Sequence, residues 1–172
     1  FELKKKKVDI LVNLSASPYT FKKLELRSKV SSFAAQYLQV PLIYVNQIGA
    51  NDNLIFDGNS FILDKNGSKI KQLKSFSEDL SSWDIEKTKP QKNKFEKSEM
   101  SSIFDALVLG VKDYAQKCGF KTALIGLSGG IDSALVSAIA TAALGSKNIY
   151  CVSMPSKCCL LYTSDAADDT PC

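Results

Sequence analysis

The octapeptide Gly126–Ser133 (GLSGGIDS) constrains the fold more strongly than any other part of this sequence. It follows the apolar run Thr122–Ile125, which predicts a short strand, and it leads into Asp132–Leu144, which predicts a helix. Asn148–Ser153 then predicts a second strand. This order predicts an α/β unit, because a strand–helix–strand connection normally joins parallel neighbours.

The octapeptide also has the chemistry of a polyphosphate-binding turn. Gly129 and Gly130 permit backbone conformations and a close approach that side chains would prevent. The turn presents N–H groups at a helix N-terminus, where the helix dipole favours an anion, and Ser128 and Ser133 add hydroxyl donors. Asp132 would repel a phosphate unless it binds a Mg²⁺ ion that neutralises the ligand. Its alternative role is that of a helix cap.

The hexapeptide Ser-Gly-Gly-Ile-Asp-Ser, between a strand and a helix, resembles the PP-loop of the N-type ATP pyrophosphatases. It fits neither GxxxxGK[ST] nor GxGxxG. The resemblance implies a Rossmann-like domain that uses ATP and Mg²⁺, attaches AMP to a substrate oxygen and holds the metal with Asp132. The ATP-binding residues that it implies in this loop are Gly126, Leu127, Ser128, Gly129, Gly130, Ile131, Asp132 and Ser133.

The wider sequence narrows the resemblance. Residues 126–145 (GLSGGIDSALVSAIATAALG), followed by residues 150–156 (YCVSMPS), are similar to NAD synthetases. In that family the second strand ends in a Met-Pro-Ser segment near the adenine, so Met154 is an implied ATP contact. Ordinary core packing is its alternative.

The first half of the chain predicts a second strand–helix–strand unit. Val8–Leu14 and Val40–Val45 predict buried strands, and Lys22–Leu38 between them predicts an amphipathic helix. Its expected buried face consists of Leu26, Val30, Phe33, Ala34 and Tyr37.

Shorter strands follow, and Asn66-Gly67 predicts a hairpin turn between the last two. We expect a β meander made of Leu54–Phe56, Ser60–Leu63 and Ile70–Leu73.

This half resembles the C-terminal part of a nitrilase-type amidase domain, an α/β sandwich. The similarity lies in residues 13–19 (NLSASPY), Lys23, Arg27, residues 44–52 (YVNQIGAND) and residues 56–61 (FDGNSF). Such a domain ahead of an NAD synthetase loop is the arrangement of the glutamine-dependent NAD synthetase family.

The resemblance implies that Ser17 and Lys23 bind glutamine. The alternatives are a turn residue before Pro18 and a solvated surface charge. The amidases of this family use a Cys nucleophile, a Glu base and a Lys, all before the Ser-Ala-Ser-Pro-Tyr segment. No Cys precedes Cys118, so we expect these three residues upstream of Phe1 and no catalytic residue within the chain.

The predicted organisation has four parts. Residues 1–80 are the end of the nitrilase-like glutaminase domain, 81–97 a lysine-rich linker, and 98–157 the start of the NAD synthetase domain. Residues 158–172 resemble a translated sequencing adapter and are expected to be non-native.

The synthetase part begins with a predicted helix, Ser98–Lys117, capped by Ser98 and ended by Gly119. Its expected apolar face consists of Ile103, Phe104, Leu107, Val111 and Tyr114.

Composition limits the partners. The net charge is +4, and the lysine clusters are not interleaved with aromatic residues, so we expect small-molecule substrates and no nucleic acid. No run of about 18 apolar residues is present, so we expect no membrane partner and a cytoplasmic protein. Cys118 and Cys151 are expected to be small buried residues in a reducing compartment. We further expect a homo-oligomer when full length.

The resemblance implies a ligase that amidates deamido-NAD to NAD. ATP would adenylate the nicotinate carboxylate with release of pyrophosphate, and nitrogen from glutamine would displace AMP. We expect the chain to be inactive by itself. Two alternatives stay open: another PP-loop synthetase or tRNA-modifying enzyme, and a non-catalytic fragment.

Overall fold

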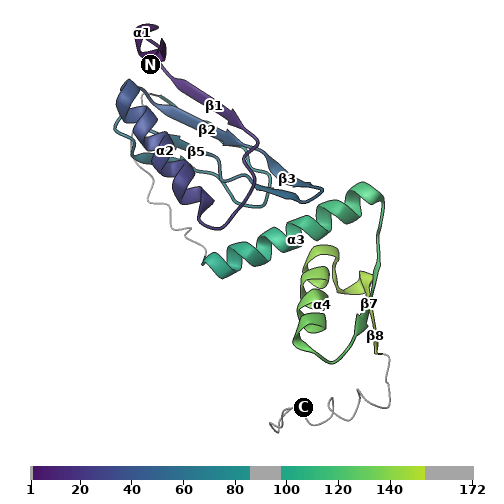
Figure 1. Ribbon diagram of the computed structural model, residues 1–172. Helices are drawn as coiled ribbons and strands as arrows, with labels where there is room; N and C mark the ends of the chain where they lie inside the picture. Colours follow the sequence, from purple (N-terminus) through teal and green to yellow (C-terminus); the bar gives the residue numbers. More distant parts are fainter. Residues whose placement is uncertain (1, 86–97, 154–172) are drawn as a thin grey trace, which may run out of the picture. The chain divides into compact units, whose positions relative to one another are not determined.

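The computed structural model describes residues 2–85 and 98–153 (Figure 1). It divides into two compact units, residues 1–110 and residues 111–172. In the parts that are described, no helix is long and apolar enough to cross a membrane. The predicted boundaries of the linker and tail fall largely outside the described residues and stay predictions.

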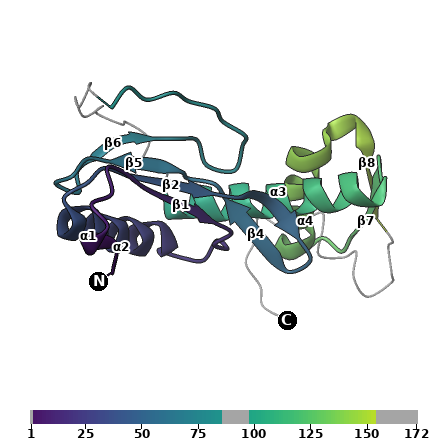
Figure 2. The same cartoon turned by 90° about the horizontal axis from the view of Figure 1, so that it is seen from above.

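The first unit contains a short helix α1 (Glu2–Lys5) and then a four-stranded sheet covered by one helix. Strand β1 (Leu11–Ser15) pairs in parallel with β2 (Leu42–Asn46), and α2 (Lys23–Leu38) connects them. The strand order is β1-β2-β5-β6, and α2 lies along one face (Figure 2). The predicted α/β crossover is therefore confirmed.

The expected meander is wrong in its pairing. Strand β4 (Leu54–Asp57) pairs with β3 (Ile48–Asn51), a strand missed in the sequence, whereas β5 (Phe61–Leu63) pairs with β2 and with β6 (Lys69–Gln72). Positive φ angles at Gly58 (65°) and Asn59 (53°) separate β4 from β5. The two-residue turn Asp52-Asn53, in which Asp52 has φ +50°, folds β4 back onto β3.

The expected buried face of α2 is wrong for Leu26, Val30 and Phe33, whereas Ala34 packs against the core and Tyr37 is half-buried. Its buried residues are Arg27, Ser31 and Ala35, spaced four apart, and Ala35 is fully buried against the core of Leu42, Tyr44, Phe61 and Leu63. Leu26, Val30 and Phe33 are 56%, 62% and 70% exposed. Small side chains let the helix approach the large sheet residues closely, so the apolar stripe faces outward.

The Asn-Gly hairpin is confirmed between β5 and β6. The Asp64 carboxylate accepts hydrogen bonds from the backbone N–H groups of Asn66 (2.9 Å) and Ser68 (2.8 Å). Gly67 has φ +76°, and its carbonyl accepts a hydrogen bond from Ser32 Oγ (2.9 Å). The Ser32–Gly67 hydrogen bond therefore joins the β5–β6 turn to α2.

Helix α3 (Glu99–Cys118) spans the division between the units. Ser98 Oγ accepts from the N–H of Ser101 (3.2 Å), and Gly119 follows the helix with φ +75°, as predicted. On this helix, Phe104, Leu107, Val111 and Tyr114 of the predicted apolar face are exposed, and Ile103 is half-buried. Spacing shows which residues share a face but not which face is buried.

The second unit contains the other predicted crossover. Strands β7 (Ala123–Leu127) and β8 (Ile149–Ser153) pair in parallel, and they are joined by α4 (Ile131–Leu144) and a 3₁₀ turn, η1 (Ser146–Asn148). The α/β fold class is thus confirmed in both halves.

The expected burial of the two cysteines is wrong. Cys118, at the last position of α3, and Cys151, on β8, are both free and exposed. Cysteine is often buried, but here the helix end and a two-stranded sheet leave both thiols at the surface.

Gly67→Ala is expected to destabilise the first unit by at least about 2 kcal/mol, because it adds strain at a positive φ and a severe clash. The added Cβ would lie 2.2 Å from Ser32 Oγ. Hydrogen exchange of α2 amides in the full-length protein measures the change.

Gly58→Ala is the matched control. It has a similar φ, +65°, but its Cβ would meet Lys74 O at an ordinary 3.5 Å. We expect a loss of about 1 kcal/mol from strain alone. Equal losses for the two variants would contradict the close approach at Gly67.

Candidate functional site

The turn at the start of α4 is the first candidate site. Strand β7 ends at Leu127, and α4 begins at Ile131 after Gly129, which has φ +88°. Gly130 is the N-cap residue, and no side chain caps the helix. Asp132 is exposed in the first turn of α4 and is therefore not the helix cap. The alternative in which Asp132 serves as the cap does not hold.

The two serines of this turn lie against each other. Ser128 Oγ is 3.2 Å from Ser133 Oγ and accepts a hydrogen bond from the N–H of Gly130 (3.4 Å). Ser133 Oγ donates to Gly130 O (2.9 Å). The first N–H groups of an α-helix have no partner within the helix, so the turn offers donors to an anion.

The sheet places this turn beside the end of β8. Because β7 and β8 are parallel, Leu127 lies opposite Ser153 at their carboxyl ends, the edge where open α/β sheets bind ligands. Met154, the implied adenine contact, follows directly but lies outside the described residues.

The residues present fit a Mg²⁺ site that a substrate completes. Within residues 2–85 and 98–153, no group of three or more His, Cys, Asp or Glu could hold a metal ion. Mg²⁺ is commonly bound through one or two carboxylates together with substrate phosphates. The exposed Asp132 carboxylate beside the N–H groups of α4 meets that requirement.

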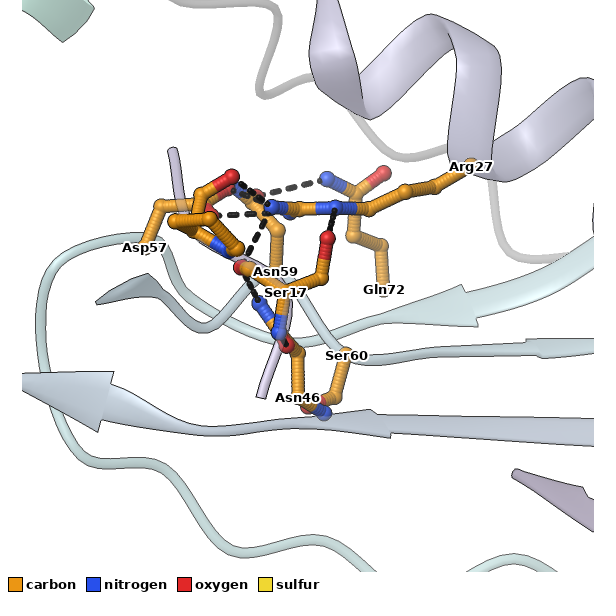
Figure 3. A network of polar contacts seen from close by, with 8 residues as sticks. Ser17, Arg27, Asn46, Asp57, Asn59, Ser60 and Gln72 are labelled. Carbon is orange, nitrogen blue, oxygen red and sulfur yellow. Dashed lines mark hydrogen bonds and ion pairs between the residues drawn. The ribbon is translucent and has the colours of Figure 1, made fainter. Parts of the chain in front are cut away.

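A buried ion pair forms the second candidate site (Figure 3). Arg27 Nη1 donates to both carboxylate oxygens of Asp57, at 2.8 and 3.0 Å, and the two side chains are 4% and 1% exposed. Arg27 also donates from Nε to Ser17 Oγ (3.1 Å) and from Nη2 to the carbonyls of Ser17 (2.7 Å) and Pro18 (2.9 Å). All its nitrogens thus have partners, as a buried guanidinium requires.

Ser17 is held from a second direction by β2. Its N–H donates to Asn46 Oδ1 (2.9 Å), and its carbonyl accepts from Asn46 Nδ2 (3.1 Å). The N–H of Asn46 in turn donates to Ser60 Oγ (3.0 Å). Ser17 is therefore more than a turn residue before Pro18: it joins a network across the unit.

The network continues beyond Asp57. Asn59 Nδ2 donates to Asp57 Oδ2 (2.7 Å), and Asn59 Oδ1 accepts from Gln72 Nε2 (3.0 Å). Lys69 Nζ donates to Gln72 Oε1 (2.6 Å). A chain of satisfied polar groups thus links α2, the β4–β5 turn and β6.

The charge of Asp57 also reaches the Ser-Pro-Tyr segment. Burial, first, and then the negative charges of Asp57 and Glu99 raise the pKa of Tyr19 above its ordinary value.

Lys23, the other implied glutamine contact, is half-buried in the first turn of α2, one turn before Arg27. Its N–H donates to Thr20 O (3.0 Å). Partial burial argues against a fully solvated surface charge, and its role toward glutamine stays a prediction.

Sequence reasoning missed the buried role of Asp57, Asn46 and Asn59. A signal was available in α2, where Arg27, Ser31 and Ala35 recur every four residues as a stripe of small residues with one cation. A cation on a buried stripe requires a carboxylate from another element.

The fold defines an α/β protein in which a unit with a four-stranded sheet precedes a parallel strand–turn–helix–strand unit. Residues 1–91 match the carbon–nitrogen hydrolase family, and residues 103–168 match the NAD synthase family. Since the first match covers more than half of the 172 residues, the chain belongs to the carbon–nitrogen hydrolase family.

Its named relatives are glutamine-dependent NAD(+) synthetases. The chain is 48% identical to that of Synechocystis over 163 residues (92% of this chain, 28% of the relative). It is 39% identical to that of Rhodobacter capsulatus (93% and 30%). The chain thus spans less than a third of these relatives.

Solved structures show the same relationship. The glutamine-dependent NAD+ synthetase from Acinetobacter baumannii, in complex with ADP, is 37% identical with a TM-score of 0.87 (96% of this chain, 32% of that one). That from Cytophaga hutchinsonii is 23% identical with a TM-score of 0.71 (84% and 25%) and supports the fold alone.

Asp57→Ala is expected to lower the free energy of unfolding by about 3–5 kcal/mol, because it leaves the Arg27 guanidinium buried without its counter-ion. Chemical denaturation with hydrogen exchange of the α2 amides measures this loss in the full-length protein. Glu25→Ala, which breaks the exposed Glu25–Lys29 pair (2.6 Å), is the control and should leave stability unchanged. A stability equal to that of the unmodified protein in Asp57→Ala would contradict the account.

Proposed function

We propose that the protein containing this chain is a ligase that converts deamido-NAD to NAD, with ATP and glutamine as co-substrates. The observation that carries this proposal is the order of two matches in one chain, a carbon–nitrogen hydrolase part followed by an NAD synthase part. Relatives of 48% and 39% identity carry the name of this activity.

In the proposed reaction, the nicotinate carboxylate of deamido-NAD attacks the α-phosphorus of ATP and pyrophosphate leaves. Ammonia from glutamine then attacks the acyl adenylate and AMP leaves, which forms the amide. The loop Gly126–Ser133 binds the pyrophosphate: the N–H groups at the start of α4 and the hydroxyls of Ser128 and Ser133 stabilise its developing charge.

Asp132 is the proposed Mg²⁺ ligand. Its carboxylate is exposed in the first turn of α4, beside the donors that would hold the phosphates. Mg²⁺, when bound, would neutralise phosphate charge as a Lewis acid. Asp132 attracts the cation, and the helix N-terminus attracts the anion.

The first unit is proposed to bind glutamine. Ser17 offers a half-buried hydroxyl, and Lys23 offers an ammonium for the substrate carboxylate. We further propose small-molecule substrates alone, no nucleic acid or membrane partner, a homo-oligomer when full length, and a cytoplasmic location.

Another PP-loop synthetase or tRNA-modifying enzyme would share the loop but not the first half. Pyrophosphate release with deamido-NAD, xanthosine monophosphate or tRNA as acceptor separates these cases. A non-catalytic fragment would release no pyrophosphate with any acceptor.

Asp132→Ala is expected to reduce NAD synthesis at least about a hundredfold in the full-length protein, because the charge on the leaving pyrophosphate is no longer offset. Glutamine hydrolysis should stay measurable. Pyrophosphate and glutamate release report the two activities. Asp9→Ala, an exposed carboxylate in the first unit, is the control. Normal NAD synthesis by Asp132→Ala would contradict the assigned role.

Lys23→Ala is expected to raise the KM for glutamine about tenfold, through loss of a charge-assisted hydrogen bond. Activity with free ammonia should be unchanged. Lys29→Ala, which removes an exposed lysine from the same helix, is the control and should leave both values unchanged. An unchanged KM in Lys23→Ala would remove this residue from the proposed site.

A further inference from the structure

Arg27 contacts the Ser17 loop more extensively than a structural ion pair requires. The pair with Asp57 uses Nη1, whereas Nε and Nη2 hold three oxygen atoms of Ser17 and Pro18 (Figure 3). The carbonyls of Ser17 and Pro18 and the Ser17 hydroxyl are thereby bound to one planar guanidinium group.

The direction of the hydrogen bond between Arg27 and the Ser17 hydroxyl is fixed. A guanidinium can only donate hydrogen bonds, so Ser17 Oγ must be the acceptor from Arg27 Nε (3.1 Å). The N–H and carbonyl of Ser17 are engaged by Asn46 and Arg27. The hydrogen of the Ser17 hydroxyl can therefore donate in another direction. A ligand oxygen that accepts a hydrogen bond would match this donor.

The charge of Arg27 is locally balanced. Asp57 accepts from Nη1 with both oxygens, and Asn59 Nδ2 donates to Asp57 Oδ2 (2.7 Å). The carboxylate holds the guanidinium in the orientation that presents Nε and Nη2 to the loop. Asp57 thus acts on Ser17 through Arg27.

We propose that Arg27 is a positioning residue that orients the Ser17 hydroxyl to donate a hydrogen bond to an oxygen of glutamine. This inference rests on the proposed function, in which Ser17 binds glutamine. Arg27 itself does not touch the substrate. Asp57 keeps Arg27 in place.

The test uses the full-length protein and Arg27→Lys, which keeps a cation beside Asp57 but loses the fork that holds Ser17. We expect the KM for glutamine to rise about tenfold, as for loss of one oriented hydrogen bond, with kcat little changed. The rate with free ammonia should be unchanged. A general folding defect would instead lower both rates.

A double-mutant cycle separates positioning from a structural role. Ser17→Ala should raise the KM for glutamine, and adding Arg27→Lys to it should produce no further rise, because the group that Arg27 orients is gone. Additive effects of the two substitutions would overturn the proposal, and so would an unchanged KM in Arg27→Lys alone.

Two further measurements keep the result interpretable. If Arg27→Lys does not fold, the neutral pair Arg27→Gln with Asp57→Asn replaces it in the same cycle, since an ion pair exchanged as a whole leaves no unpaired charge. If the unmodified protein makes no NAD from deamido-NAD and glutamine, the proposed function fails. If it does so and the cycle is additive, only the positioning role fails.

Discussion

The buried pair of Arg27 and Asp57 is the interaction on which the first unit depends. Each charge would be costly to bury alone, and each is offset by the other and by further hydrogen bonds. Through this pair α2, the Ser17 loop and the end of β4 are tied together, although Ser17 and Asp57 lie 10 and 30 residues from Arg27 along the chain. The loop that presents Ser17 is therefore held by hydrogen bonds to both Arg27 and Asn46.

The two candidate sites are built in different ways. The turn at Gly126–Ser133 is local, since its donors are backbone N–H groups and serines within eight residues. The Ser17 site is assembled from side chains of separate elements. The first needs a strand and a helix in sequence, whereas the second needs a completed sheet with a helix packed on it.

Close packing explains the unexpected orientation of α2. Ala35 packs with Leu42, Tyr44 and the rest of the sheet core, and Ser31 is buried one turn before it, so the helix axis lies close to the sheet. Gly67 extends the same close approach to the β5–β6 turn, where a methyl group would meet Ser32. Large side chains such as Phe33 have no room on this face and lie outward.

The sequence by itself determined both strand–helix–strand units, the Asn-Gly turn, the Ser98 cap and the glycine-rich turn before α4. Tertiary structure decided which face of α2 is buried, that β4 pairs with β3, and that Ser17 meets Arg27 and Asn46. The physical reason is the sequence separation between the residues that interact. Caps, turns and helix starts depend on residues a few positions apart, whereas burial and ion pairing depend on which distant elements meet.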